Sequence, residues 1–215
     1  MAILNLIAQG LYETVLMVAT SLILGIVAGG SLGIYLYYHS QHGLKPRLYL
    51  YHSLEFIINS IRSIPYIILT VLLIPLTRLL TGSSIGTLSA IVPLSLAAIL
   101  LIARATEDTF KGIPKGLVEM GLALGAKPRY LIGRILLPEV LSPLIDEITN
   151  IAIILVGFSA MAGTVGGGGL GDLAIRYGYQ RYDTTLMVLI VIILWILVQL
   201  IQGMGRFLSR YFRYH

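Results

Sequence analysis

The chain contains no cysteine and little charge. Because cysteine is absent from all 215 residues, disulfide bonds, thiolate metal sites and a cysteine nucleophile are excluded. Only 12% of residues are charged, against roughly 25% in soluble domains, whereas 57% are hydrophobic. One water-soluble core could not enclose so many apolar side chains. The composition therefore excludes a soluble enzyme, a disordered chain and a fibrous repeat, and it indicates an integral membrane protein.

Uncharged apolar runs follow one another along the sequence and predict an all-α, polytopic transmembrane protein. Four runs are near or above the roughly 20 residues that a helix needs to cross a bilayer; they cover residues 14–38, 79–103, 148–171 and 184–205. A fifth run, residues 63–77, reaches that length only with residues from either side, so five spans are expected. Helices are favoured because the runs lack the two-residue alternation of a membrane barrel.

The positions of Lys and Arg predict the orientation of these spans. An odd number of spans puts the termini on opposite sides. With the N-terminus outside and the C-terminus cytoplasmic, most of the 15 Lys and Arg, Arg62 included, lie on the cytoplasmic side, as the positive-inside rule requires. Residues 104–134 are then cytoplasmic, and the glycine-rich residues 163–183 are external or line a cavity. One domain is expected over residues 1–215, with its core at about 14–205.

Glycine and proline recur inside the expected spans. Gly25, Gly29, Gly30 and Gly33 lie in the first span, and Pro65 lies in the second. Two interpretations remain open. Small residues allow helices to pack closely in membranes, and helix breakers also occur in helices kinked around a transport pathway.

A helical segment with marked ends lies in the expected cytoplasmic stretch. Pro114 suits the first position of a helix, and Gly125 suits the position that follows one. Residues between them fall on one helical face: Leu117, Gly121 and Leu124. A second helix is expected to run toward Pro138. Residues 114–138 therefore predict an elbow whose apolar face lies on the membrane surface or in a groove of a partner.

The same segment resembles the "EAA" loop of binding-protein-dependent ABC importer permeases. Glu119–Met120–Gly121 is followed after three residues by Gly125, and after nine more by Ile135–Leu136–Leu137–Pro138, which matches the spacing of the family motif. Met120 and Gly121 depart from it, because alanine is usual there, and Met120 is the larger side chain. Further stretches resemble the methionine-uptake branch of this family: residues 60–66, 91–94, 155–163, 168–171 and 177–179.

The resemblance implies a type I ABC importer permease for D- or L-methionine in the bacterial cytoplasmic membrane. The elbow would be a coupling helix that docks on a separate ATPase subunit. Its contact residues would be Leu117, Glu119, Met120, Gly121, Leu124, Gly125 and Pro138. The implied assembly is a homodimer of this chain in the lipid bilayer, with two ATP-binding subunits on the cytoplasmic side and an extracytoplasmic substrate-binding protein.

The chain itself is not expected to be an enzyme or to hold a cofactor or metal. A phosphate-binding P-loop needs lysine followed by Ser or Thr, and none of the four lysines is followed by either. ATP-Mg is therefore expected on the partner subunit. The sequence pI of about 9.5 does not indicate a nucleic-acid partner, because the basic residues are scattered between apolar runs.

Two groups of residues are candidates for the pathway itself. Phe158, Ser159 and Met161 lie just before the glycine-rich stretch, and Tyr66 follows Pro65. An aromatic ring and a flexible thioether could close a narrow path and also contact a thioether substrate. The alternative for each of these residues is ordinary packing between spans.

An ion pair is a second hypothesis for the spans. Arg62, Asp146 and Glu147 are expected at similar depth near the inner boundary, where ionisable residues tend to pair. Arg62 would then bind Asp146 or Glu147, unless each side chain reaches the interface separately.

Other functions remain open at this point. The chain could be a permease for another small solute, such as a different amino acid, or a passive channel. It could also be an intramembrane hydrolase that uses Ser84, which lies in a G-x-S-x-G sequence, or Ser159. Only an importer needs a partner ATPase.

Overall fold

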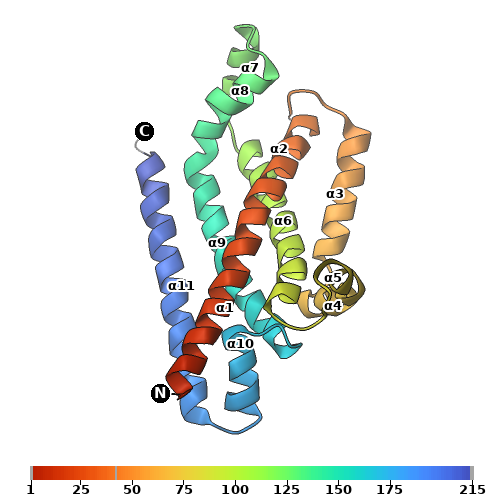
Figure 1. Ribbon diagram of the computed structural model, residues 1–215. Coiled ribbons are helices and arrows are strands. Elements are labelled where there is room, and N and C mark those ends of the chain that lie inside the picture. Colours follow the sequence, from red (N-terminus) through yellow and green to blue (C-terminus); the bar gives the residue numbers. More distant parts are fainter. Residues whose placement is uncertain (1, 42, 214–215) are drawn as a thin grey trace.

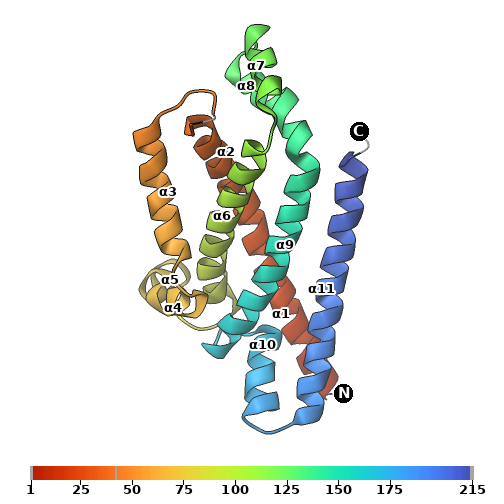
Figure 2. The ribbon, with the colours of Figure 1, turned by 180° about the vertical axis from the view of Figure 1, so that it is seen from behind.

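The computed structural model describes residues 2–41 and 43–213, and its regular elements in those ranges are all helical (Figures 1 and 2). This confirms the expected all-α class. The elements in chain order are α1 Ala2–Leu24, η1 Gly25–Gly29, α2 Gly30–His39, α3 Leu48–Arg62, α4 Tyr66–Leu72, α5 Ile74–Thr81, α6 Thr87–Lys111, α7 Lys115–Ala123, α8 Pro128–Leu131, η2 Ile132–Leu136, α9 Leu137–Thr164, α10 Gly169–Leu173, η3 Ala174–Tyr179 and α11 Thr184–Arg213, where η marks a π-helical segment.

Four continuous helical rods are long and apolar enough to cross a membrane. They cover Ile3–His39, Thr87–Lys111, Pro128–Thr164 and Thr184–Arg213. A fifth candidate span is the pair α3 and α4, which bends by 99° at its break. Five spans therefore result only if this bent pair counts as one.

The second span is broken where the sequence places a proline. Pro65 has no amide hydrogen to donate, and its ring disfavours helical geometry at Ile64. Helix α3 ends at Arg62, and α4 begins at Tyr66 in a new direction. The break at Pro65 agrees with the kinked-helix interpretation that the sequence left open for this residue.

The third span lies further along the chain than expected. Residues 82–86 form a turn in which Gly82 and Gly86 have positive φ angles of 76° and 107°, and this turn separates α5 from α6. Helix α6 then continues to Lys111, so residues 104–111 extend the span instead of forming a loop. Charged side chains in this last part pair with one another along the helix, which stabilises the extension.

Helix α6 lies at the centre of the bundle, with the α1–α2 rod packed closely along it. A Cβ atom at Gly29 would lie 2.4 Å from the carbonyl oxygen of Ile99, and one at Gly33 would lie 2.4 Å from that of Ala103. Gly30 has no neighbour within 4 Å. Close helix packing is therefore the correct interpretation for Gly29 and Gly33, because only glycine permits these approaches.

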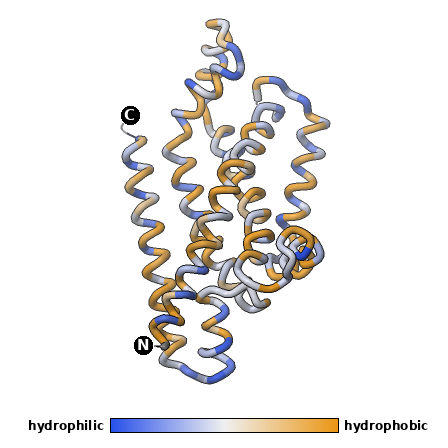
Figure 3. The backbone as a smooth tube through the Cα atoms, in the orientation of Figure 1, coloured by the Kyte–Doolittle hydropathy of each residue, from blue (hydrophilic) through white to orange (hydrophobic). Residues whose placement is uncertain are grey.

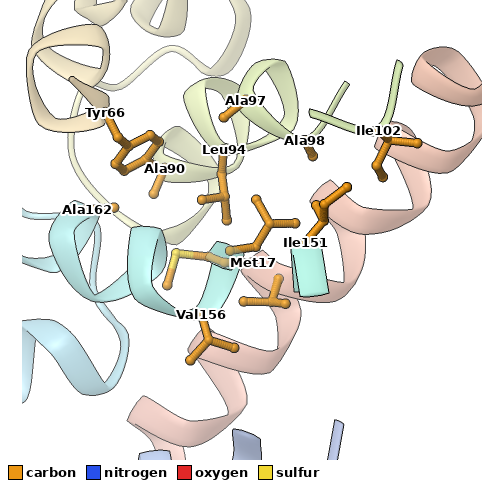
Figure 4. Packing of buried hydrophobic residues seen from close by; sticks show 12 residues of the cluster. Met17, Tyr66, Ala90, Leu94, Ala97, Ala98, Ile102, Ile151, Val156 and Ala162 are labelled. Carbon is orange, nitrogen blue, oxygen red and sulfur yellow. The ribbon is translucent and has the colours of Figure 1, made fainter. Parts of the chain in front are cut away.

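Apolar side chains from several rods meet beside α6 (Figure 4). Leu94 of α6, Met17 of α1 and Leu155 of α9 are fully buried there. Hydrophobic residues also predominate along the long helical rods, whereas polar residues gather at the α7–α8 end and around α10 (Figure 3). This distribution suits a bundle whose middle lies in hydrocarbon and whose two ends meet water.

The two ends of the bundle carry different elements (Figure 1). Helix α1 begins at the end that holds α10, whereas α11 finishes toward the end that holds α7 and α8. The chain thus starts and finishes at opposite ends, as an odd number of crossings requires.

Candidate coupling segment and transport pathway

The elbow is a rigid turn with a well-formed end. Helix α7 covers Lys115–Ala123, and Pro114 stands at its N-cap. Gly125 has a φ angle of 76°, as its predicted position after the helix requires. Its N–H donates to the Leu122 carbonyl at 2.9 Å, and the Ala126 N–H donates to the Gly121 carbonyl at 3.1 Å. These two bonds form a Schellman motif, which satisfies carbonyls that the helix end leaves free.

The inner face of the elbow is fastened to the bundle. A Cβ atom at Gly121 would lie 2.4 Å from Cδ1 of Leu131, so α7 and α8 are in close contact. Leu131 is fully buried together with Phe110 of α6 and Tyr37 of α2. Leu117 packs partly buried against the same cluster. The elbow therefore moves with the ends of α2 and α6 and is not a loose loop.

The outer face of the elbow is free for a partner. Met120 is 56% exposed and Leu124 is 81% exposed, and Glu119 is exposed beside them. The sequence predicts Leu117 and Leu124 on one helical face, but the two side chains have different surroundings. Helix α7 ends before Leu124, and the chain turns there. Figure 1 shows that α7 and α8 project beyond the other helices at this end. Met120 and Leu124 are thus available to a groove, whereas Leu117 is only partly exposed.

One face of α9 is exposed along its whole length. From Pro143 onward the exposed residues of α9 recur at helical spacing: Pro143, Asp146, Glu147, Asn150, Ile154, Gly157, Met161 and Thr164. We call these eight residues the path face. Carboxylates and an amide on a spanning helix are unstable against hydrocarbon, so this face must meet water or another protein surface.

The gate candidates divide between the path face and the interior. The rings of Tyr66 and Phe158 stack, with centroids 4.3 Å apart. Met161 lies on the path face and is 47% exposed. Ser159 is buried, and its hydroxyl donates to the Val156 carbonyl at 2.7 Å. The structure therefore brings Tyr66 and Phe158 together, exposes Met161 and buries Ser159.

Arg62 does not pair with the two acidic residues of α9. Among the ion pairs of the described residues, none joins Arg62 to Asp146 or Glu147. Arg62 lines a cavity of about 430 Å³ beside Tyr66 and Phe158. Asp146 and Glu147 line a different cavity of about 710 Å³, together with Asp108 and Glu139.

The depth expected for Arg62 was wrong for a topological reason. Helix α3 starts near the elbow end and runs away from it, so its last residue, Arg62, lies at the remote end of the helix (Figure 1). Arg62 therefore lies at the end of α3 that is away from the elbow.

A buried charged cluster in α3 and α6 was missed by the sequence analysis. Glu107 is 0% exposed and accepts hydrogen bonds from Tyr51 and Arg104. Arg104 also contacts Glu55, and Lys111 forms an ion pair with Glu107. The spacing of Arg104, Glu107 and Lys111 at i, i+3 and i+7 was a detectable signal.

The glycine-rich stretch is held tightly against α1. The Glu13 carboxylate accepts a hydrogen bond from the Gly169 N–H at 2.7 Å, and the Thr14 hydroxyl accepts one from the Leu170 N–H at 2.9 Å. Gly168 and Gly169 have φ angles of 79° and 78°, which only glycine adopts easily. This stretch therefore forms a close contact between α1 and α10.

The family model described as "Binding-protein-dependent transport system inner membrane component" matches residues 21–214. The chain belongs to this family. As a family member it is a multi-pass inner-membrane component of a transport system and not a hydrolase or a free-standing channel. No hydrogen bond joins Ser84 or Ser159 to a histidine within the described ranges.

Individual members of the family are similar over nearly the whole chain. A Vibrio cholerae protein named as a probable D-methionine transport system permease, MetI, is 44% identical over 96% of this chain and 92% of its own. The Escherichia coli D-methionine permease MetI is 43% identical over 74% of this chain and 73% of its own. A crystal structure of the MetNI methionine ABC transporter, in an inward-facing conformation, matches with a TM-score of 0.95 and 42% identity over 97% of both chains.

Proposed function

We propose that this chain is the membrane-spanning permease subunit of an ATP-driven methionine importer. The observation that carries the proposal is the combination of 42% identity with a TM-score of 0.95 to the methionine transporter chain over 97% of both chains. Similarity this close over a whole helical bundle includes both the elbow and the path face. A permease for another amino acid is the second candidate, because no single residue here requires methionine.

In this proposal two copies of the chain enclose the pathway. The path face of α9 carries Asp146, Glu147 and Asn150, which need water or a protein neighbour inside a membrane. A second copy that presents the same face across a two-fold axis supplies both, since it leaves a polar passage between the copies. This homodimer is the smallest assembly that removes the polar face from lipid.

ATP-driven movement enters through the elbow. Residues 114–138 form the coupling segment of a single permease domain, residues 1–215. Met120, Glu119 and Leu124 dock in a groove of a separate ATPase subunit, one for each copy. The capped helix α7 transmits the motion because its inner face is fixed to α2 and α6. Such switching requires different contacts in the two states.

The orientation follows from the elbow. Docking on ATPase subunits puts α7 and the end of α11 in the cytoplasm, and it puts the start of α1 and the α10 region outside. An extracytoplasmic binding protein then delivers solute near the glycine-rich stretch. Phe158, Tyr66 and Met161 form the gate between that entrance and the cytoplasm. Most of the Lys and Arg remain on the cytoplasmic side, although Arg62 does not.

Transport by purified components tests the proposal. The chain is assembled with its ATPase and binding protein in lipid vesicles, and uptake of labelled L- and D-methionine is compared with uptake of other amino acids. We expect ATP-dependent accumulation of methionine that unlabelled methionine alone competes away. Preferential uptake of another amino acid would identify the second candidate, and uptake without ATP would contradict an importer.

A further inference from the structure

Helices α3 and α6 are joined by a cluster of buried ionic contacts. The Tyr51 hydroxyl donates to Oε1 of Glu107 at 2.8 Å, and Nζ of Lys111 donates to the Tyr51 hydroxyl at 3.0 Å. Arg104 donates to Oε2 of Glu107 at 2.9 Å and to Oε1 of Glu55 at 3.1 Å. Tyr51 and Glu55 belong to α3, and the other three residues belong to α6. We call these five residues the α3–α6 joint.

Both oxygens of Glu107 are occupied, and its side chain is inaccessible to solvent. A buried carboxylate that loses a partner cannot regain the lost interaction from water. The two helices therefore cannot slide past one another without exposing or orphaning a charge. Apolar contacts are less directional and would oppose such sliding less strongly.

The joint lies between the elbow and the aromatic stack. Lys111 is the last residue of α6, and α7 begins four residues later at Lys115. In the other direction, α3 ends at Arg62, and the chain bends into α4, whose first residue, Tyr66, stacks on Phe158. The end of α6, helix α3 and helix α4 thus connect α7 with the gate candidates Tyr66 and Phe158.

The other side of α6 is also fixed. Gly29 and Gly33 bring α2 within a close approach of its backbone. Helix α6 is therefore held by glycine packing on the α2 side and by charge pairs on the α3 side. On the α3 side the chain continues through Arg62 into α4 and Tyr66.

We propose that Glu107 is a positioning residue of the α3–α6 joint, through which displacement of the elbow moves α3, α4 and Tyr66 as one body. The Tyr51 hydroxyl contacts both Glu107 and Lys111 of α6, and the Arg104–Glu55 pair is the second contact between the two helices in this joint. The inference rests on the proposed coupling role of α7, and it is independent of which solute is carried.

Two variants each remove part of the joint with little change in volume, while the Arg104–Glu55 contact remains: Tyr51→Phe and Glu107→Gln. The matched control is His52→Gln, because the contacts of His52 with Glu55 and with the Tyr51 ring both lie within α3. The first readout is the accessibility of Ile154→Cys on the path face, measured by maleimide labelling of this chain with and without ATP and vanadate. Since the chain has no native cysteine, this label reports one position. The second readout is methionine taken up per ATP hydrolysed.

In the full complex we expect ATP to change the labelling rate of Ile154→Cys in the parent and in His52→Gln. In Tyr51→Phe and Glu107→Gln, ATP hydrolysis should continue while labelling no longer responds, and methionine taken up per ATP should fall several-fold. A nucleotide response equal to the parent's in Tyr51→Phe would overturn the inference. If Glu107→Gln fails to assemble, Tyr51→Phe decides the outcome.

The two proposals fail in different ways. If the parent complex hydrolyses ATP and shows the labelling response but takes up no methionine, the methionine assignment fails, and the joint is still judged by labelling. If methionine uptake is normal in every variant, the joint is wrong, and the transport function stands.

Discussion

The rings of Tyr66 and Phe158 lie parallel, with centroids 4.3 Å apart and only 3° between their planes. Tyr66 opens α4 just after the proline break, and Phe158 lies in α9 one turn from Met161. The stack therefore joins the broken second span to the helix that carries the path face. Stacked aromatic pairs contribute about 0.5–1.5 kcal/mol beyond the area they bury, which is small enough to break during a transport cycle.

Replacement of Phe158 by leucine should loosen this contact without emptying the site. We expect ATP hydrolysis that no longer depends on the binding protein, because the gate candidates lose their aromatic contact. The measurement is ATPase activity in vesicles with and without binding protein and methionine. Met161→Ala is expected to change the same ratio or the uptake rate. Parent-like values in both variants would exclude a gate at this position.

Gly125→Ala should impair coupling through the shape of the elbow. A left-handed conformation costs an L-residue roughly 1–2 kcal/mol, and Gly125 has a φ angle of 76°. The Schellman end of α7 should therefore distort, and co-purification of the ATPase subunit and methionine uptake should both fall. The control is Gly116→Ala, since Gly116 lies inside α7 with nothing within 4 Å of a new Cβ atom. Equal losses in the two variants would contradict this account.

Glu119→Lys tests the docking face. Glu119 is exposed beside Met120, and its conversion to lysine reverses the charge presented to the partner. We expect a large loss of ATPase binding in pull-down of the complex, while the permease alone keeps its thermal stability. Normal binding would show that Glu119 lies outside the contact.

Gly29→Ala should destabilise the bundle itself. The new Cβ atom would lie 2.4 Å from the Ile99 carbonyl oxygen, so α1–α2 and α6 must separate. Overpacking of this kind typically costs about 1–3 kcal/mol. The temperature at which the purified permease aggregates in detergent should fall. Gly30→Ala provides the comparison, because Gly30 has open space around it and should show no loss.

Glu13→Gln should weaken the contact between α1 and α10. The Glu13 carboxylate accepts the Gly169 N–H at 2.7 Å, and hydrogen bonds to charged groups are worth about 1.5–3 kcal/mol. We expect faster hydrogen exchange at residues 166–173 and lower stimulation of ATPase activity by the binding protein. Unchanged exchange would mean that glycine packing alone holds this stretch.

Composition and local pattern were sufficient to predict the membrane class, the all-helical architecture and the elbow. Hydrophobic composition predicts the membrane class, because apolar side chains in this proportion need hydrocarbon. Local backbone chemistry predicts where helices end: Gly125 terminates α7, and Pro65 interrupts the second span. These features depend on residues near one another in the chain, so pattern and spacing were sufficient to predict them.

The tertiary structure alone decided which side chains meet. Arg62 is separated from Asp146 because α3 runs away from the elbow, and the direction of a helix depends on how the whole chain packs. Glu107 pairs with Tyr51, 56 residues earlier in the sequence, and no periodicity within either helix encodes that contact. Leu117 turned inward for a similar reason, since its surroundings are set by Phe110 and Leu131. Long-range packing fixes such partners, and local sequence does not.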